Sequence, residues 1–154
     1  MAATRKPLPN KAVVGAVAEV LSRHVAPHAR LTLALSGGLD SVALLHVLAA
    51  LRAAHPFDLQ AVHVHHGLSP HADEWADFCT RLCTSHAVDL AVHRVRIARD
   101  DPAGIEAAAR RERQRVFAGL DADFLLTAHQ LDDQAETLML QLLRGAGPKG
   151  LAAM

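Results

Sequence analysis

The chain has 154 residues and no formal net charge, and 51% of its residues are hydrophobic. This composition excludes a disordered or fibrous protein, and the length suffices to bury one core. No apolar run reaches the ~20 residues of a membrane span, and no signal core follows the N-terminal charges. We therefore expect a cytoplasmic protein with no membrane partner. The charge balance gives no sign of the basic surface typical of nucleic-acid binding.

Apolar periodicity predicts helices that alternate with short strands. In chain order these are a helix over 12–25, a strand over 31–35, a helix over 42–51, a strand over 59–64, a helix after Ser69, a strand over 89–95, a helix over 105–117, a strand over 123–128 and a helix over 131–143. For the helix after Ser69 we expect Ser69 as N-cap and Pro70 at the first position. The alternation predicts an α/β fold, a Rossmann-like parallel sheet with helices on both faces.

The two cysteines, Cys79 and Cys83, lie four residues apart in the helix expected after Ser69. They share its apolar stripe with Ala72, Trp75, Ala76 and Leu82. We interpret both thiols as core packing, because free cysteine is commonly buried. A disulfide is disfavoured in a reducing compartment, and a metal site would need more ligands.

The segment Ser36-Gly37-Gly38-Leu39-Asp40-Ser41 lies between a predicted strand and a predicted helix. Two glycines let the backbone turn sharply and approach a ligand closely. The helix that follows offers unpaired N–H groups and the positive end of its dipole, which favours a phosphate. Asp40 is unexpected beside an anion and suggests a bound cation such as Mg²⁺. The alternative is an ordinary strand-to-helix turn.

Further polar segments, 65–69 and 129–133, also follow predicted strands. In a parallel sheet these segments and 36–41 should line one edge together. His63 and His65 alternate along a strand, and His66 lies at its end. A general acid or base suits this residue type, and a structural histidine is an equally good interpretation.

Charged residues in two other segments allow two interpretations each. Asp133 and Glu136 are three residues apart on a predicted helix, so their side chains face the same way. They are either solvated acids near the helix N-terminus or a site for an ammonium group or Mg²⁺. A dense basic cluster, Arg110, Arg111, Arg113 and Arg115, is either a solvated helix face or a set of phosphate contacts.

The loop 36–41 resembles the signature of the PP-loop ATP pyrophosphatases. Four more segments, 64–75, 104–113, 127–137 and 144–154, are similar in order to conserved blocks of one branch of that family, the tRNA(Ile)-lysidine synthases. The resemblance implies the adenine nucleotide alpha hydrolase fold. It also implies ATP-dependent joining of free L-lysine to the wobble cytidine of a tRNA(Ile) with a CAU anticodon.

The resemblance also implies roles for individual residues. ATP would be bound by Ser36, Gly37, Gly38, Leu39, Asp40 and Ser41, with Asp40 holding Mg²⁺. Asp133 and Glu136 would hold the lysine cation, and Arg110 and Arg113 would contact phosphate or the tRNA. His66 and Asp40 complete the catalytic candidates.

Members of this branch are longer than 154 residues. We therefore expect residues 1–154 to be a PP-loop catalytic domain truncated at its C-terminal end, with 1–10 flexible and with a homodimer as a candidate assembly. The alternatives are another PP-loop ligase, such as a tRNA thiolase or an amide synthetase, and a nucleotide-binding module without chemistry.

Overall fold

The computed structural model describes residues 11–128. Its elements in order are α1 (Lys11–His24), β1 (Arg30–Ala34), α2 (Leu39–Leu51), β2 (Asp58–His65), α3 (Ala72–Ser85), β3 (Asp89–Arg94), α4 (Ile105–Ala118) and β4 (Phe124–Leu126). The predicted alternation of helices and strands is confirmed over this range. The helix predicted over 131–143 lies outside the described residues.

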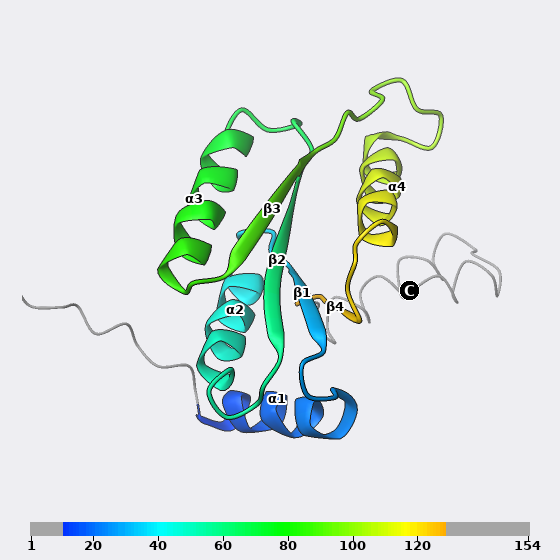
Figure 1. Ribbon diagram of the computed structural model, residues 1–154. Coiled ribbons are helices and arrows are strands. Elements are labelled where there is room, and N and C mark those ends of the chain that lie inside the picture. Colours follow the sequence, from blue (N-terminus) through cyan, green and yellow to red (C-terminus); the bar gives the residue numbers. More distant parts are fainter. Residues whose placement is uncertain (1–10, 129–154) are drawn as a thin grey trace, which may run out of the picture.

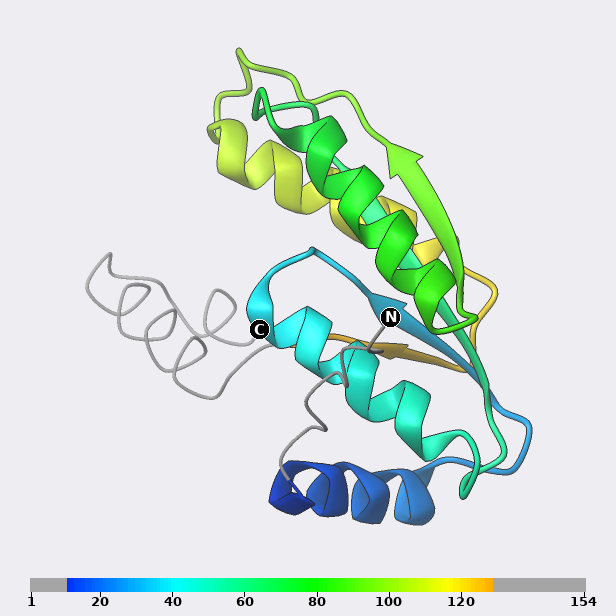
Figure 2. The same ribbon diagram turned by 90° about the vertical axis from the view of Figure 1, so that its left-hand side faces the viewer.

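All four strands of the sheet are parallel, in the order β3-β2-β1-β4. Helices α2 and α3 lie on one side of the sheet and α4 lies on the other (Figures 1 and 2). The predicted parallel α/β fold with helices on both faces is therefore confirmed. The chain leaves β1 toward β2 and later returns on the opposite side of β1 to form β4. This reversal makes the carboxyl end of β1 a topological switch point, where open α/β sheets bind ligands.

The core is built on the central strand β1. Leu31, Thr32 and Leu33 are almost completely buried, because neighbouring strands pair with β1 on both sides and helices cover both faces. The hydroxyl of Thr32 accepts a hydrogen bond from the Gln60 side chain of β2 at 2.8 Å, so this buried polar group is satisfied. The leucines of α2, among them Leu45 and Leu48, pack against this strand.

Helix α3 differs from the expectation at its start. It begins at Ala72, and the Oγ of Ser69 accepts the N–H of His71 at 3.2 Å, which closes a turn before the helix. The predictions that Ser69 is the N-cap and that Pro70 is the first helical residue were wrong. Serine competes effectively for local backbone donors, and here this competition makes a turn rather than a cap.

The buried face of α3 is narrower than predicted. Cys79 and Cys83 are fully buried free thiols, as expected for core packing. Trp75, however, is 51% exposed, so its assignment to the core stripe was wrong.

Strand β4 is shorter than the predicted 123–128 and pairs with β1 through three residues. Just before it, the N–H of Arg30 donates to the Asp123 carboxylate at 2.8 Å, while the N–H of Asp123 donates to the Arg30 carbonyl. Within residues 11–128, every helix is too short or too polar to cross a lipid bilayer.

Candidate phosphate and nucleotide site

The turn between β1 and α2 depends on a glycine at position 37. Its φ of +89° lies in a region that side-chain-bearing residues rarely adopt. A Cβ at this position would also come within 3.3 Å of the Cys79 Sγ and 3.9 Å of a Phe78 ring carbon. The loop therefore rests directly on α3, and the glycine is required both by backbone conformation and by space.

Hydrogen bonds between the two serines hold the loop in shape. The Ser41 hydroxyl donates to the Gly38 carbonyl at 2.9 Å and lies 3.1 Å from the Ser36 hydroxyl. The Ser36 oxygen also accepts the Gly38 N–H at 3.2 Å. The first helical hydrogen bond of α2 runs from Val42 to Gly38, so the amides of residues 39–41 have no carbonyl partner within the helix. Such amides at a helix N-terminus form an anion site.

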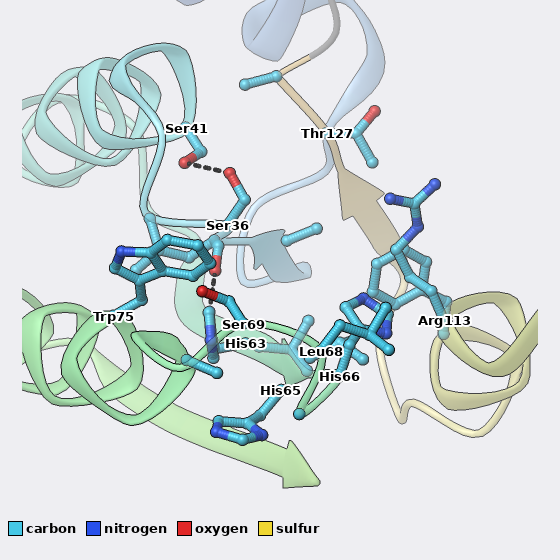
Figure 3. Close-up of a pocket in the computed structure, with 18 residues that line it drawn as sticks. Ser36, Ser41, His63, His65, His66, Leu68, Ser69, Trp75, Arg113 and Thr127 are labelled. Atoms are coloured by element: carbon cyan, nitrogen blue, oxygen red, sulfur yellow. Dashed lines mark hydrogen bonds between the residues drawn. The ribbon is translucent and has the colours of Figure 1, made fainter. Parts of the chain in front are cut away.

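A cavity of about 500 Å³ opens at the carboxyl ends of β1, β2 and β4. Residues from the loop, from 62–69, from α3, from α4 and from the segment after β4 line it. Figure 3 shows Ser36, Ser69 and Trp75 on one side and His66, Arg113 and Thr127 on the other. The expectation that the loops 36–41 and 65–69 share one edge of the sheet is confirmed. Segment 129–133 lies outside the described residues.

The structure distinguishes the three histidines of the β2 end. His63 is buried, and its Nδ1–H donates to the Leu35 carbonyl at 2.8 Å, so it is a structural residue that ties β2 to the end of β1. The Nε2 of His65 lies 3.2 Å from both the Asp73 carboxylate and the Arg94 guanidinium. Arg94 donates to the same carboxylate at 2.7 Å and lowers the pKa of Asp73. These contacts fix His65 beside β3.

Of the three histidines, His66 is the one with a ring nitrogen available to react. It lines the cavity, and its Nδ1 is buried without a hydrogen-bond partner among the described residues. Burial lowers the pKa of His66, and the nearby Arg113 guanidinium lowers it further. The ring is therefore neutral at pH 7, and a neutral imidazole can accept a proton.

The four arginines of the basic cluster on α4 lie partly at the cavity and partly on the surface. Arg113 lines the cavity, whereas Arg110 is exposed and is not among the lining residues. Arg111 pairs with Asp101, and Arg115 pairs with Glu112 at 2.8 Å. At this face of α4 only Arg113 supplies a positive charge to the cavity wall.

The other predicted site residues lie at or beyond the rim of the cavity. Leu39 and Asp40 are exposed on the first turn of α2 and do not line the cavity. Within residues 11–128, no group of three or more His, Cys, Asp or Glu side chains could hold a metal ion. Asp133 and Glu136 lie outside the described residues. Trp75, a cavity residue, was not predicted as one, because its spacing matches the core stripe of α3.

A family model for the PP-loop domain, an ATP-binding domain, matches residues 10–154. The chain belongs to the PP-loop family. The loop 36–41 follows β1 at the switch point of the sheet described above. The sequence-based assignment of the family is confirmed.

Curated relatives of this PP-loop domain include tRNA(Ile)-lysidine synthases. The synthase of Aromatoleum aromaticum is 56% identical over 132 residues, which are 84% of this chain and 31% of the relative. That of Nitrosomonas europaea is 49% identical over 134 residues, 87% of this chain and 29% of the relative. The chain thus spans about a third of the length of the curated relatives that it matches.

Among solved structures, the domain is similar to NcsA, a U34-tRNA thiolase from Methanococcus maripaludis that holds an iron–sulfur cluster. The TM-score is 0.73 at 24% identity, over 92% of this chain and 51% of the thiolase. This likeness shows a shared fold.

Proposed function

We propose that this PP-loop domain carries out the ATP-dependent chemistry of a tRNA(Ile)-lysidine synthase. The observation that carries the proposal is the identity of 49–56% with lysidine synthases over more than four fifths of the chain. The cavity supports it, because the candidate phosphate loop 36–41, a neutral histidine and an arginine converge at the carboxyl edge of the sheet. A tRNA(Ile) with a CAU anticodon and free L-lysine are then the substrates.

The reaction has two steps. In the first, the C2 carbonyl oxygen of the wobble cytidine attacks the α-phosphorus of ATP, and pyrophosphate leaves with the electron pair of the broken P–O bond. In the second, the ε-amine of lysine forms a C–N bond at C2, and AMP leaves with the electrons of the C2–O bond. Adenylation thus converts a poor leaving oxygen into a good one.

The loop would bind the triphosphate. In our proposal the amides at the start of α2 and the hydroxyls of Ser36 and Ser41 donate to phosphate oxygens, with Gly37 and Gly38 allowing the close approach. Each serine hydroxyl now bonds within the loop, so a bound phosphate replaces an internal partner. The amides at the start of α2 are held by the helix before the substrate binds, and such fixed donors favour the charge that develops on the leaving pyrophosphate.

His66 and Arg113, on the cavity wall that faces the loop 36–41 (Figure 3), would take part in the attack by lysine. The lysine ε-ammonium must release a proton before it can attack, and the neutral ring of His66 can accept it. Arg113 lies beside His66 and would pair with a phosphate of ATP or of the tRNA. Arg110, one turn earlier on the exposed surface of α4, would contact the tRNA backbone outside the cavity.

We assign the remaining two roles to carboxylates. Asp40, with the phosphates of ATP, would hold Mg²⁺, and one carboxylate fits this ion because Mg²⁺ is commonly bound by one or two carboxylates plus substrate phosphates. When bound, the ion neutralises phosphate charge. Asp133 and Glu136 would hold the lysine cation.

The test is lysine incorporation. The protein is incubated with ATP, radiolabelled lysine and a tRNA(Ile) transcript with a CAU anticodon, and both tRNA-bound label and pyrophosphate are measured. We expect both products to appear together, and a transcript whose wobble base is not cytidine to yield neither. Incorporation of label into that control transcript, or none into the CAU transcript, contradicts the proposal.

The same assay separates the alternative functions. A PP-loop ligase of another kind would release pyrophosphate only with ammonia or a sulfur donor in place of lysine. The two cysteines, both buried in the core, count against an iron–sulfur cluster held by cysteines of this domain. A binding module without chemistry would bind ATP and release no pyrophosphate with any acceptor.

A further inference from the structure

Trp75 occupies an unusual position on α3. Its helical neighbours Ala72, Ala76 and Cys79 are 8%, 4% and 0% exposed and pack against the sheet, whereas Trp75 is 51% exposed. The indole lines the cavity beside Ser36 and Ser69 (Figure 3). A large aromatic surface left open inside a cavity, rather than on a convex surface, is characteristic of a ligand contact.

The surroundings of the indole indicate what kind of ligand it would meet. Small side chains, Ser69 and Ala72, lie near it in the cavity wall, so they leave space next to the ring. The phosphate loop begins at Ser36 on the same side, and Arg113 stands on the opposite side (Figure 3). A planar aromatic group beside phosphate donors, with a guanidinium across the cavity (Figure 3), matches the two parts of a nucleotide, a base with a flat face and an anionic phosphate.

We propose that Trp75 is a nucleobase-stacking residue of this cavity. This inference rests on the proposed function, which brings two nucleobases to the site: the adenine of ATP and the wobble cytosine of the tRNA. Both present the same planar heteroaromatic face to the indole. Stacking orients the base without reading its edge, and hydrogen bonds from other groups supply the selectivity.

The composition provides a direct spectroscopic test. Trp75 is the only tryptophan in the chain, and the chain has no tyrosine. Intrinsic fluorescence therefore reports on this indole, and a stacked base quenches it. The probes are ATP, inorganic tripolyphosphate, and a short hairpin RNA with a CAU loop. Tripolyphosphate occupies the phosphate loop without a base, so it should displace ATP and leave the emission nearly unchanged.

Quenching by ATP alone identifies adenine as the stacked base. Quenching that appears only with the hairpin RNA, and is lost with an abasic wobble position, identifies the target cytosine. Either result supports the proposal.

Variants test whether the contact contributes to binding. Trp75→Leu should weaken binding of the quenching ligand by roughly fivefold to a hundredfold, measured by calorimetry, and Trp75→Phe should recover most of the loss. In turnover assays the Leu variant should raise the KM for that ligand much more than it changes kcat. Phe124→Leu alters another exposed aromatic residue, outside the cavity, and should change neither value.

The outcomes separate this inference from the proposed function. If ATP binds and lysine is incorporated, while no probe quenches Trp75 and the Leu variant binds normally, the stacking role is wrong and the function stands. If neither ATP nor the RNA binds the protein, both fail. Equal losses in the Leu and Phe variants also overturn the proposal, because a contact that phenylalanine cannot supply is not simple stacking.

Discussion

Gly37 of the loop 36–41 lies directly over Cys79 of α3, so that a Cβ added to Gly37 would come within 3.3 Å of the Cys79 Sγ. The same glycine has a φ of +89°. We predict that Gly37→Ala lowers the free energy of unfolding by about 1–2 kcal/mol, because an L residue is strained at this φ. ATP affinity should also fall, since the loop must shift to relieve the contact. Urea denaturation and calorimetry measure the two effects.

Gly38→Ala is the matched control for stability. Its φ is −72°, and an added Cβ would lie 3.4 Å from the Ser36 hydroxyl, an ordinary contact. We expect the free energy of unfolding to change by less than about 0.5 kcal/mol. Equal destabilisation by both alanines would show that neither the φ of Gly37 nor its contact with Cys79 constrains the loop.

His63→Leu should destabilise the fold. The substitution removes the imidazole N–H that bonds to the buried Leu35 carbonyl and leaves this acceptor with only the Cys79 thiol, at 4.0 Å, at a cost of about 1–3 kcal/mol. His93→Leu makes the same chemical change on the exposed surface of β3 and should cost less than about 0.5 kcal/mol. Urea melts of the two variants make the comparison, and similar midpoints would refute a structural role for His63.

Arg113→Gln should raise the pKa of His66. The guanidinium charge is the second cause of the lowered pKa, after burial, so removing it brings the pKa closer to the ordinary value of 6.5 without restoring it fully. NMR titration of the imidazole protons measures the shift. Arg111→Gln is the control, because Arg111 pairs with Asp101 outside the cavity and its loss should leave the His66 titration unchanged. A downward shift in the Arg113 variant would contradict the electrostatic interpretation.

Asp40→Asn should remove the part of ATP affinity that depends on Mg²⁺. Asparagine keeps the size of the side chain and loses the charge that a hard cation requires. Calorimetric titration with ATP, in Mg²⁺ and in a chelator, gives the two affinities for each protein. We expect a gap between them in the parent protein and little gap in the variant. An undiminished gap would mean that other groups hold the ion.

Glu136→Ala should raise the lysine concentration needed for incorporation by roughly tenfold to a hundredfold, because a hydrogen-bonded carboxylate partner of the ammonium group is lost. The KM for lysine should rise while the KM for ATP stays constant. Glu19→Ala, on the exposed surface of α1, is the control and should change neither. An unchanged lysine requirement in the Glu136 variant would end the ammonium-site proposal.

Local patterns explain why the sequence-based prediction of β1, β2 and the turn between β1 and α2 succeeds. A short apolar run that ends in Ser36-Gly37-Gly38 predicts a strand, a turn and a helix from neighbouring residues alone. Trp75 shows that such local patterns do not predict burial at the border of a helix stripe. It lies about 60° around the helix axis from Ala72, at the border of the buried stripe. Whether a border residue is covered depends on its neighbours in space, and here the cavity leaves it open.

The sequence by itself determined the alternation of strands and helices, the turn at 36–38 and the family, because each depends on the order of residues along the chain. The tertiary structure decided which residue of a given type lies at the cavity and which has a structural or surface role. Among three histidines, it made His63 structural, bound His65 to Asp73 and Arg94, and left His66 at the cavity. Among four arginines of α4, it placed Arg113 in the cavity wall. Strand order and helix position set these differences, and both arise from contacts between segments far apart in the sequence.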